Sequence, residues 1–153
     1  MSISSMICST ISEFSPSAAA AVDGADAVCL SVPVRAIPGL LQEIAPHLDP
    51  AAVITDVGST KARIVRELDS SAELSRAANS SVKSVARFIG SHPMAGSEKT
   101  GVQHASEDIF EKRTVIVTPG ATSGPAEMRR VSRFWRALGG RIVQMEPEAH
   151  DAA

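Results

Sequence analysis

The chain has 153 residues, of which 44% are hydrophobic, enough for one domain with a packed core and too many for general disorder. Its net charge is −2, and its 15 basic residues are spread along the sequence, which argues against a nucleic-acid or membrane-surface partner. The two cysteines, Cys8 and Cys29, lack CxxC spacing. We therefore expect a cytoplasmic protein with reduced thiols and without a metal site. No apolar run reaches the length of a membrane span.

The first part of the chain differs in composition from the rest. Residues 1–17 are rich in serine and residues 18–22 in alanine, with no basic region of the kind that opens a secretory signal. We expect residues 1–24 to be poorly ordered or a remnant of a longer segment, although the alanine run can form a helix. Residues 25–153 are expected to form the folded domain.

From residue 27 onward, short apolar runs alternate with segments in which apolar residues recur three and four positions apart. The short runs predict strands near 27–32, 52–57, 87–90, 114–118 and 141–145. The other segments predict helices at 37–48 with a break near Pro46, at 60–74, at 101–108 and at 125–138, with a loop over 75–84. Strands that alternate with helices indicate an α/β, Rossmann-like, mostly parallel sheet with helices on both faces.

Three strand ends carry small or polar residues, at 31–34, 56–61 and 90–101. In a parallel sheet these ends meet at one edge, which is where open α/β sheets bind ligands. Gly58 allows a close backbone approach, and Ser59 or Thr60 can cap the next helix, whose first N–H groups can then meet an anion. A tight turn with a solvated Lys61 is the alternative. Asp56 is either a structural carboxylate or a cofactor contact.

The third of these ends, residues 90–101, holds three glycines, a proline and His92. A histidine at this edge can exchange a proton near neutral pH, and Glu98, six residues later, can orient it. The alternative is an ordinary strand-to-helix turn with a solvated or capping histidine. Residues 96–101 have the GxxxxG spacing of a phosphate loop, but no lysine follows the second glycine, so we reject that function.

Three segments in this order, DVGSTK at 56–61, GSHPMAGSEKTGV at 90–102 and FEKRTVIVTP at 110–119, resemble the prephenate dehydrogenase family. That family includes the arogenate and cyclohexadienyl dehydrogenases, and the resemblance runs from about residue 25 to residue 151. It implies an oxidative decarboxylation in tyrosine biosynthesis, in which prephenate or arogenate gives up a hydride to NAD or NADP and the ring becomes aromatic. The partner is then a small-molecule substrate, and the full-length protein is a homodimer.

The resemblance also implies roles for individual residues. His92 binds the 4-hydroxyl of the substrate and assists removal of its proton, Ser59 lies between this histidine and the nicotinamide, and Glu98 helps to organise the substrate pocket. The residues expected to contact the cofactor follow the first two strands and are Ser31, Val32, Pro33, Asp56, Val57, Gly58 and Ser59.

The chain departs from this family at both ends. It lacks the GxGxxG unit with which such enzymes begin, and it stops at Ala153, where their C-terminal helical domain begins. We therefore expect a fragment with a sheet incomplete at the N-terminus and an exposed edge prone to association, and its activity in isolation stays open. Two alternatives remain: a non-catalytic fragment or regulatory relative that binds an aromatic-pathway metabolite, or another Rossmann-like oxidoreductase. The sequence does not distinguish prephenate from arogenate, or NAD from NADP.

Overall fold

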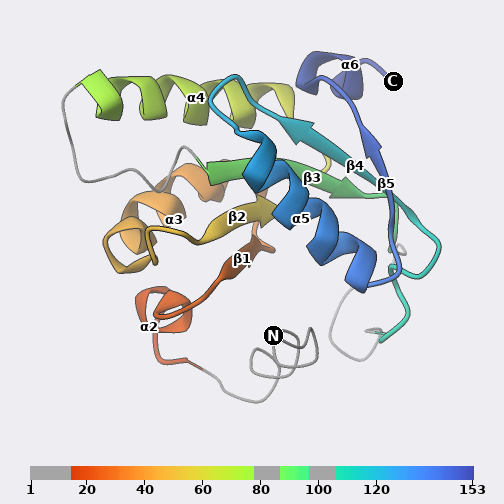
Figure 1. The fold of residues 1–153 in the computed structure, drawn as a ribbon, viewed down its shortest axis with the longest axis horizontal. Helices are drawn as coiled ribbons and strands as arrows, with labels where there is room; N and C mark the ends of the chain where they lie inside the picture. The colour runs from red at the N-terminus through yellow and green to blue at the C-terminus, as the bar shows by residue number, and fades with distance from the viewer. Residues whose placement is uncertain (1–14, 78–86, 97–105) are drawn as a thin grey trace.

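The computed structural model describes residues 15–77, 87–96 and 106–153, which build a five-stranded sheet with helices on both faces (Figure 1). The strands lie in the sheet in chain order and are β1 (Ala27–Leu30), β2 (Val53–Asp56), β3 (Phe88–Pro93), β4 (Thr114–Pro119) and β5 (Arg141–Gln144). All neighbouring strands are parallel except β3 and β4, which are antiparallel. The mostly parallel α/β architecture that the sequence predicts is therefore confirmed.

The third strand continues further than the predicted range of 87–90. Across the antiparallel pairing with β4, His92 lies opposite Ile116 and Pro93 lies opposite Val115. Pro93 has no N–H to donate, and the strand ends at this residue. The predicted end of this strand at residue 90 is therefore wrong, and His92 belongs to the strand. Because side chains alternate along a strand, Ser91 and His92 face opposite sides of the sheet.

One face of the sheet is covered by α2 (Ala18–Val22), α3 (Ile37–Ile44) and α4 (Ala62–Ala77), with short 3₁₀ helices η1 (Val34–Ala36) and η2 (Ala45–His47). The break predicted near Pro46 is the change from α3 to η2. The helices bury their apolar stripes against the strands, through residues that include Ile37, Leu41 and Ile44 of α3 and Ile64 of α4, and Ile54 of β2 is fully buried beneath them. This packing holds the start of α4 against the carboxyl end of the sheet.

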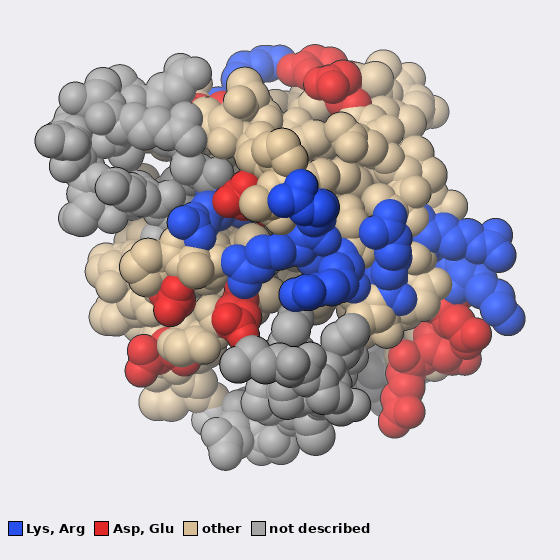
Figure 2. Space-filling view, viewed as in Figure 1, with Lys and Arg blue, Asp and Glu red and all other residues tan. Residues whose placement is uncertain are grey.

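The opposite face is covered by α5 (Pro125–Ala137), which begins at a proline and ends before Gly139, a residue with φ of 84°. Val131 and Trp135 are each only 1% exposed and pack on the strands from this side. The outer surface of α5 is basic: Arg133 and Arg136 are exposed on this helix, and Figure 2 shows a group of arginine and lysine side chains on this face of the molecule. The apolar and charged stripes of α5 thus lie on its two sides, as helical periodicity requires.

Smaller differences from the sequence predictions concern segment limits. α4 runs to Ala77, three residues into the predicted loop of 75–84, and residues 78–86 lie outside the described residues. Of the helix predicted at 101–108, residues 101–105 also lie outside the described residues, and residues 106–108 are not helical.

Within the segment 1–24, the alanine run forms α2 as the sequence allows, and Val22 joins the core at 6% exposure; residues 1–14 lie outside the described part. A further helix, α6 (Pro147–Asp151), closes the chain beside α4. Among the described helices, none combines the length and the apolar character needed to cross a membrane.

Candidate functional site

The carboxyl ends of β1, β2 and β3 meet at one edge of the sheet, as their parallel pairing requires. The turn after β2 lies directly against the segment after β1, because a Cβ on Gly58 would overlap the side chain of Val34. Ser31 and Ser59 are exposed on these two segments, whereas Leu30 and Asp56, the last residues of the two strands, are buried. The edge therefore presents small polar groups and backbone on a rigid base.

A buried ion pair holds the turn after β2 in place. Asp56 and Lys61 are both 0% exposed, and the ammonium of Lys61 contacts Asp56 Oδ2. The same oxygen accepts a hydrogen bond from the N–H of Gly58 at 2.9 Å, and Oδ1 accepts one from the N–H of Ser91, also at 2.9 Å. Burial lowers the pKa of Lys61, and the negative charge of Asp56 opposes that shift. Both oxygens of Asp56 are thus occupied within the protein, the arrangement expected of a structural carboxylate.

The N-terminus of α4 is closed by a residue from the other end of the chain. Asp151 accepts hydrogen bonds from the N–H of Lys61 at 2.7 Å and from the N–H of Ala62 at 2.9 Å. These are two of the donors that the first turn of a helix leaves without partners. The expectation that this helix start offers free N–H groups to an anion is therefore wrong for these two donors, because a carboxylate of the protein already binds them.

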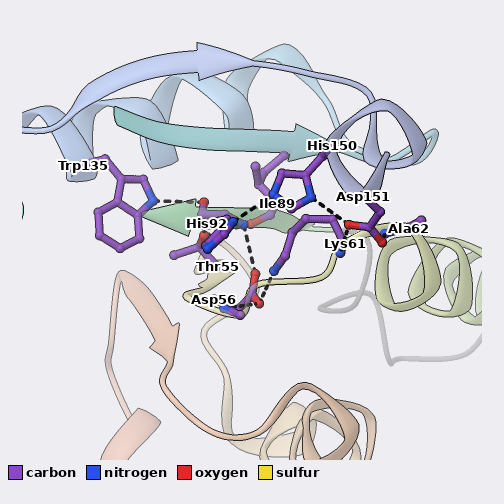
Figure 3. Close-up of polar contacts among 11 residues, drawn as sticks. Thr55, Asp56, Lys61, Ala62, Ile89, His92, Trp135, His150 and Asp151 are labelled. Atoms are coloured by element: carbon purple, nitrogen blue, oxygen red, sulfur yellow. Dashed lines mark hydrogen bonds and ion pairs between the residues drawn. The ribbon is translucent and has the colours of Figure 1, made fainter. Parts of the chain in front are cut away.

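His92 is linked to the same carboxylate through a second histidine (Figure 3). Nδ1 of His92 lies 2.9 Å from Nε2 of His150, and Nδ1 of His150 lies 2.7 Å from Oδ1 of Asp151. His150 is 8% exposed, whereas His92 is half-buried. The two rings meet edge to face, with centroids 5.1 Å apart. The result is a continuous chain of hydrogen bonds from β3 to α6 and on to the start of α4.

Two of these groups have shifted pKa values. Burial lowers the pKa of His92, with further lowering by His150 and Lys61, while Asp56 and Asp151 act in the opposite direction. For Asp151, burial acts to raise the pKa, but the hydrogen bonds from His150 and from the N–H groups of Lys61 and Ala62 prevail and lower it. His92 is thereby kept neutral and Asp151 ionised near pH 7.

On the other face of β3, a buried cluster of polar side chains is joined to the strand by hydrogen bonds. The hydroxyl of Ser91 accepts a hydrogen bond from Nε1 of Trp135 at 3.0 Å and lies 2.6 Å from the hydroxyl of Thr55. Thr55 also donates to the carbonyl of Ile89 at 2.8 Å. The indole of α5 is thus tied to the backbone region that carries His92, so the position of His92 is determined from both faces of the sheet.

The structure brings together some of the residues that the sequence singled out. His92, Gly58 and Ser59 lie at the carboxyl ends of neighbouring strands, with Ser31, Val32 and Pro33 on the segment beside them. Glu98 lies outside the described residues.

Sequence reasoning missed the contacts that Lys61, His150 and Asp151 make. The only signal for His150 and Asp151 was that the resemblance to a family extends to residue 151.

The described residues include no group of three or more His, Cys, Asp or Glu that could hold a metal ion. Cys29 is a free thiol, and burial, followed by the charge of Asp56, raises its pKa to about 11. It therefore stays protonated and is not a nucleophile near neutral pH. The chemistry available at the edge is accordingly that of an imidazole, hydroxyl groups and backbone N–H groups.

Comparison with known proteins gives a consistent result. Residues 6–144 match the family described as prephenate dehydrogenase, nucleotide-binding domain. The chain is 34% identical over 131 residues to the prephenate dehydrogenase of Bacillus subtilis, covering 85% of this chain and 33% of that protein. It is 33% identical, also over 131 residues, to the cyclohexadienyl dehydrogenase of Zymomonas mobilis, covering 86% of this chain and 41% of that one.

Among solved structures, the chain is similar to prephenate dehydrogenase from Aquifex aeolicus in complex with hydroxyphenyl propionate and NAD⁺. The TM-score is 0.75 at 33% identity, over 90% of this chain and 44% of that chain. The chain thus spans between a third and a half of the length of the relatives described above.

Proposed function

The chain belongs to the prephenate dehydrogenase family, and we propose on that basis that the complete protein catalyses the NAD(P)-dependent oxidative decarboxylation of prephenate or arogenate in tyrosine biosynthesis. The hydroxyl group on ring carbon 4 loses its proton, and hydride leaves the same carbon. The bond from ring carbon 1 to the carboxylate then breaks, and its electron pair completes the aromatic ring as carbon dioxide departs. The product is 4-hydroxyphenylpyruvate or tyrosine. NAD(P), when bound, accepts the hydride.

The observation that carries this proposal is the placement of His92. It lies on β3 beside the segments that follow β1 and β2, so a substrate held at this edge would lie between an imidazole and the nucleotide-binding turns. Its Nδ1 is engaged by His150, and of the described residues none contacts its Nε2 through a hydrogen bond. Nε2 is thus the nitrogen available to a substrate hydroxyl, and the lowered pKa of His92 favours the neutral form that a general base requires.

The same edge suits the cofactor. Ser31, Pro33 and Ser59 are exposed, and the backbone of the turn at Gly58 is held firmly by Asp56. We propose that the nicotinamide half of the cofactor lies along the segments at 31–33 and 57–59, with Ser59 between it and His92. Asp56 acts in this scheme through the turn that it holds, because both of its carboxylate oxygens are already bound.

Three further expectations belong to the proposal. Glu98 helps to organise the substrate pocket, the complete protein is a homodimer, and it works in the cytoplasm. Support for the pocket role comes from the spacing of Glu98 six residues after His92. Support for the homodimer comes from the family resemblance, and support for the cytoplasm comes from the two cysteines, which are few and lack CxxC spacing.

The test is His92→Asn in the complete protein, with steady-state kinetics on prephenate and arogenate using NAD⁺ and NADP⁺. Asparagine keeps a polar side chain of similar size but cannot accept a proton. We expect kcat to fall by roughly a hundred- to ten-thousand-fold, the usual contribution of a general base, with cofactor affinity nearly unchanged. His47→Asn, at an exposed position in η2, is the matched control and should behave like the parent. A loss of less than about threefold at His92 contradicts a proton-transfer role.

A further inference from the structure

His92 is connected to two residues that the proposed function does not yet use. We propose that His150 and Asp151 are positioning residues that fix the tautomer of His92, so that its Nε2 is the nitrogen that accepts the substrate proton. This inference rests on the proposed function for the identity of the proton donor. It does not depend on that function for the tautomer itself.

Asp151 has no proton to give. Its carboxylate faces three donors: the N–H of Lys61 at 2.7 Å, the N–H of Ala62 at 2.9 Å and Nδ1 of His150 at 2.7 Å. Two of these are backbone N–H groups, which can only donate. The hydrogen bonds lower the pKa of Asp151 despite its partial burial, so the group is ionised and accepts only.

The ionised carboxylate of Asp151 determines which ring nitrogen of each histidine carries the hydrogen. Because the carboxylate accepts, Nδ1 of His150 carries a hydrogen and donates it. In neutral His150 the other nitrogen, Nε2, is then an acceptor, and it faces Nδ1 of His92 at 2.9 Å. Nδ1 of His92 must therefore be the donor in that contact. The proton of neutral His92 lies on Nδ1, and the lone pair is on Nε2.

Titratable groups from three elements surround His92 and affect its pKa. Lys61 from the start of α4 and His150 from α6 disfavour a positive charge on His92, whereas Asp56 from β2 and Asp151 from α6 favour it. Burial disfavours the positive charge most strongly, and the balance of these effects lowers the pKa of His92. If His150 instead took up a proton, both its nitrogens would donate, and His92 would have to present Nε2–H. Nε2 of His92 would then carry a hydrogen and could not accept a proton from the substrate.

In the reaction, the O–H bond of the substrate hydroxyl breaks and an N–H bond forms at Nε2 of His92. The imidazolium that results still donates through Nδ1 to His150, and the negative charge of Asp151 stabilises it through that ring. The proton returns to the oxygen of the new phenol as the ring becomes aromatic, so His92 ends in its starting state. His150 and Asp151 touch neither substrate nor cofactor in this scheme.

The variants are chosen at His150, because Asp151 also caps α4 and its replacement would disturb that helix. His150→Leu removes both hydrogen bonds. His150→Gln offers one acceptor and one donor, and can bond to His92 and Asp151 together. Loss of an orienting partner from a metal-ligating histidine typically costs ten- to a hundredfold. We expect a fall in kcat of that order for His150→Leu, with unchanged cofactor affinity, and recovery of most of the activity in His150→Gln.

The decisive measurement is the tautomer, read from the ¹⁵N chemical shifts of His92 in the complete protein labelled at histidine. The proposal requires that Nδ1 of His92 carries the hydrogen in the parent and in His150→Gln. In His150→Leu this preference for the Nδ1–H tautomer should be lost. A parent protonated at Nε2 overturns the proposal, as does a folded His150→Leu protein with kcat within about threefold of the parent.

If His150→Leu does not fold, the parent and His150→Gln still decide the question. A parent that shows the Nδ1–H tautomer but turns over neither prephenate nor arogenate contradicts the proposed function and leaves the tautomer assignment standing.

Discussion

Replacing Asp56 with asparagine should destabilise the domain strongly, because the carboxylate uses both of its oxygens. Oδ1 accepts from the N–H of Ser91, and Oδ2 accepts from the N–H of Gly58 and from the ammonium of Lys61. An asparagine has a single oxygen. Whichever way its amide is turned, an NH₂ group meets a donor, and the buried ammonium loses its counter-charge. Removing one partner of a buried ion pair typically costs about 3–5 kcal/mol, and we expect Asp56→Asn to fall in that range.

Replacing Lys61 with methionine should cost less. The methionine fills the space of the lysine stem, and the carboxylate keeps its hydrogen bonds from the two backbone N–H groups. In the double variant the asparagine no longer meets an ammonium, so the combined loss should be smaller than the sum of the single losses by roughly 1–3 kcal/mol. The assay is urea denaturation of the complete protein and of the three variants. Losses that add to within about 0.5 kcal/mol would refute the coupling.

The pH dependence gives an independent readout. Lys61 already has a pKa below 10.5, and without Asp56 the two largest contributions that raise this pKa disappear. Between the folded-state pKa and 10.5, the unfolded chain then binds more protons than the folded one, so the stability of Asp56→Asn rises with pH across that window. The double variant lacks the lysine and should not show this rise. A flat profile for Asp56→Asn would mean that Lys61 reaches solvent when its partner is removed.

Two further predictions concern packing around the site. Ser91→Ala leaves the Nε1–H of Trp135 without its acceptor inside the core, whereas Thr55 keeps its hydrogen bond to the carbonyl of Ile89. The free energy of unfolding measured by urea denaturation should therefore fall by about 1–3 kcal/mol. No measurable loss would mean that the indole finds another partner. Gly58→Ala places a methyl group into Val34 and within 2.8 Å of Asp56 Oδ2, at a cost of roughly 1–3 kcal/mol. Adding Val34→Ala should recover part of that loss in thermal denaturation, and no recovery would count against the clash.

The sequence by itself determined the elements of this fold and the class of its chemistry. Buried strands appear as short apolar runs, and α5 shows a proline at its start, a 3.6-residue period and glycine at its end. These are local signals, since each depends on residues within one turn or one strand. His92 and the DVGS turn were also visible, because a histidine or a glycine at a strand end can be recognised without knowing its neighbours.

Only the tertiary structure decided what surrounds His92. The antiparallel pairing of β3 with β4 extends β3 through His92, and no local pattern of apolar residues encodes the direction of a strand. His150 lies 58 positions from His92 in sequence, and Asp151 lies 90 positions from Lys61, whose N–H it binds. Contacts over such separations depend on how the strands are ordered and how α6 packs beside α4. The proton-accepting nitrogen of His92 is set by that packing, and no feature within the HPMAG segment specifies it.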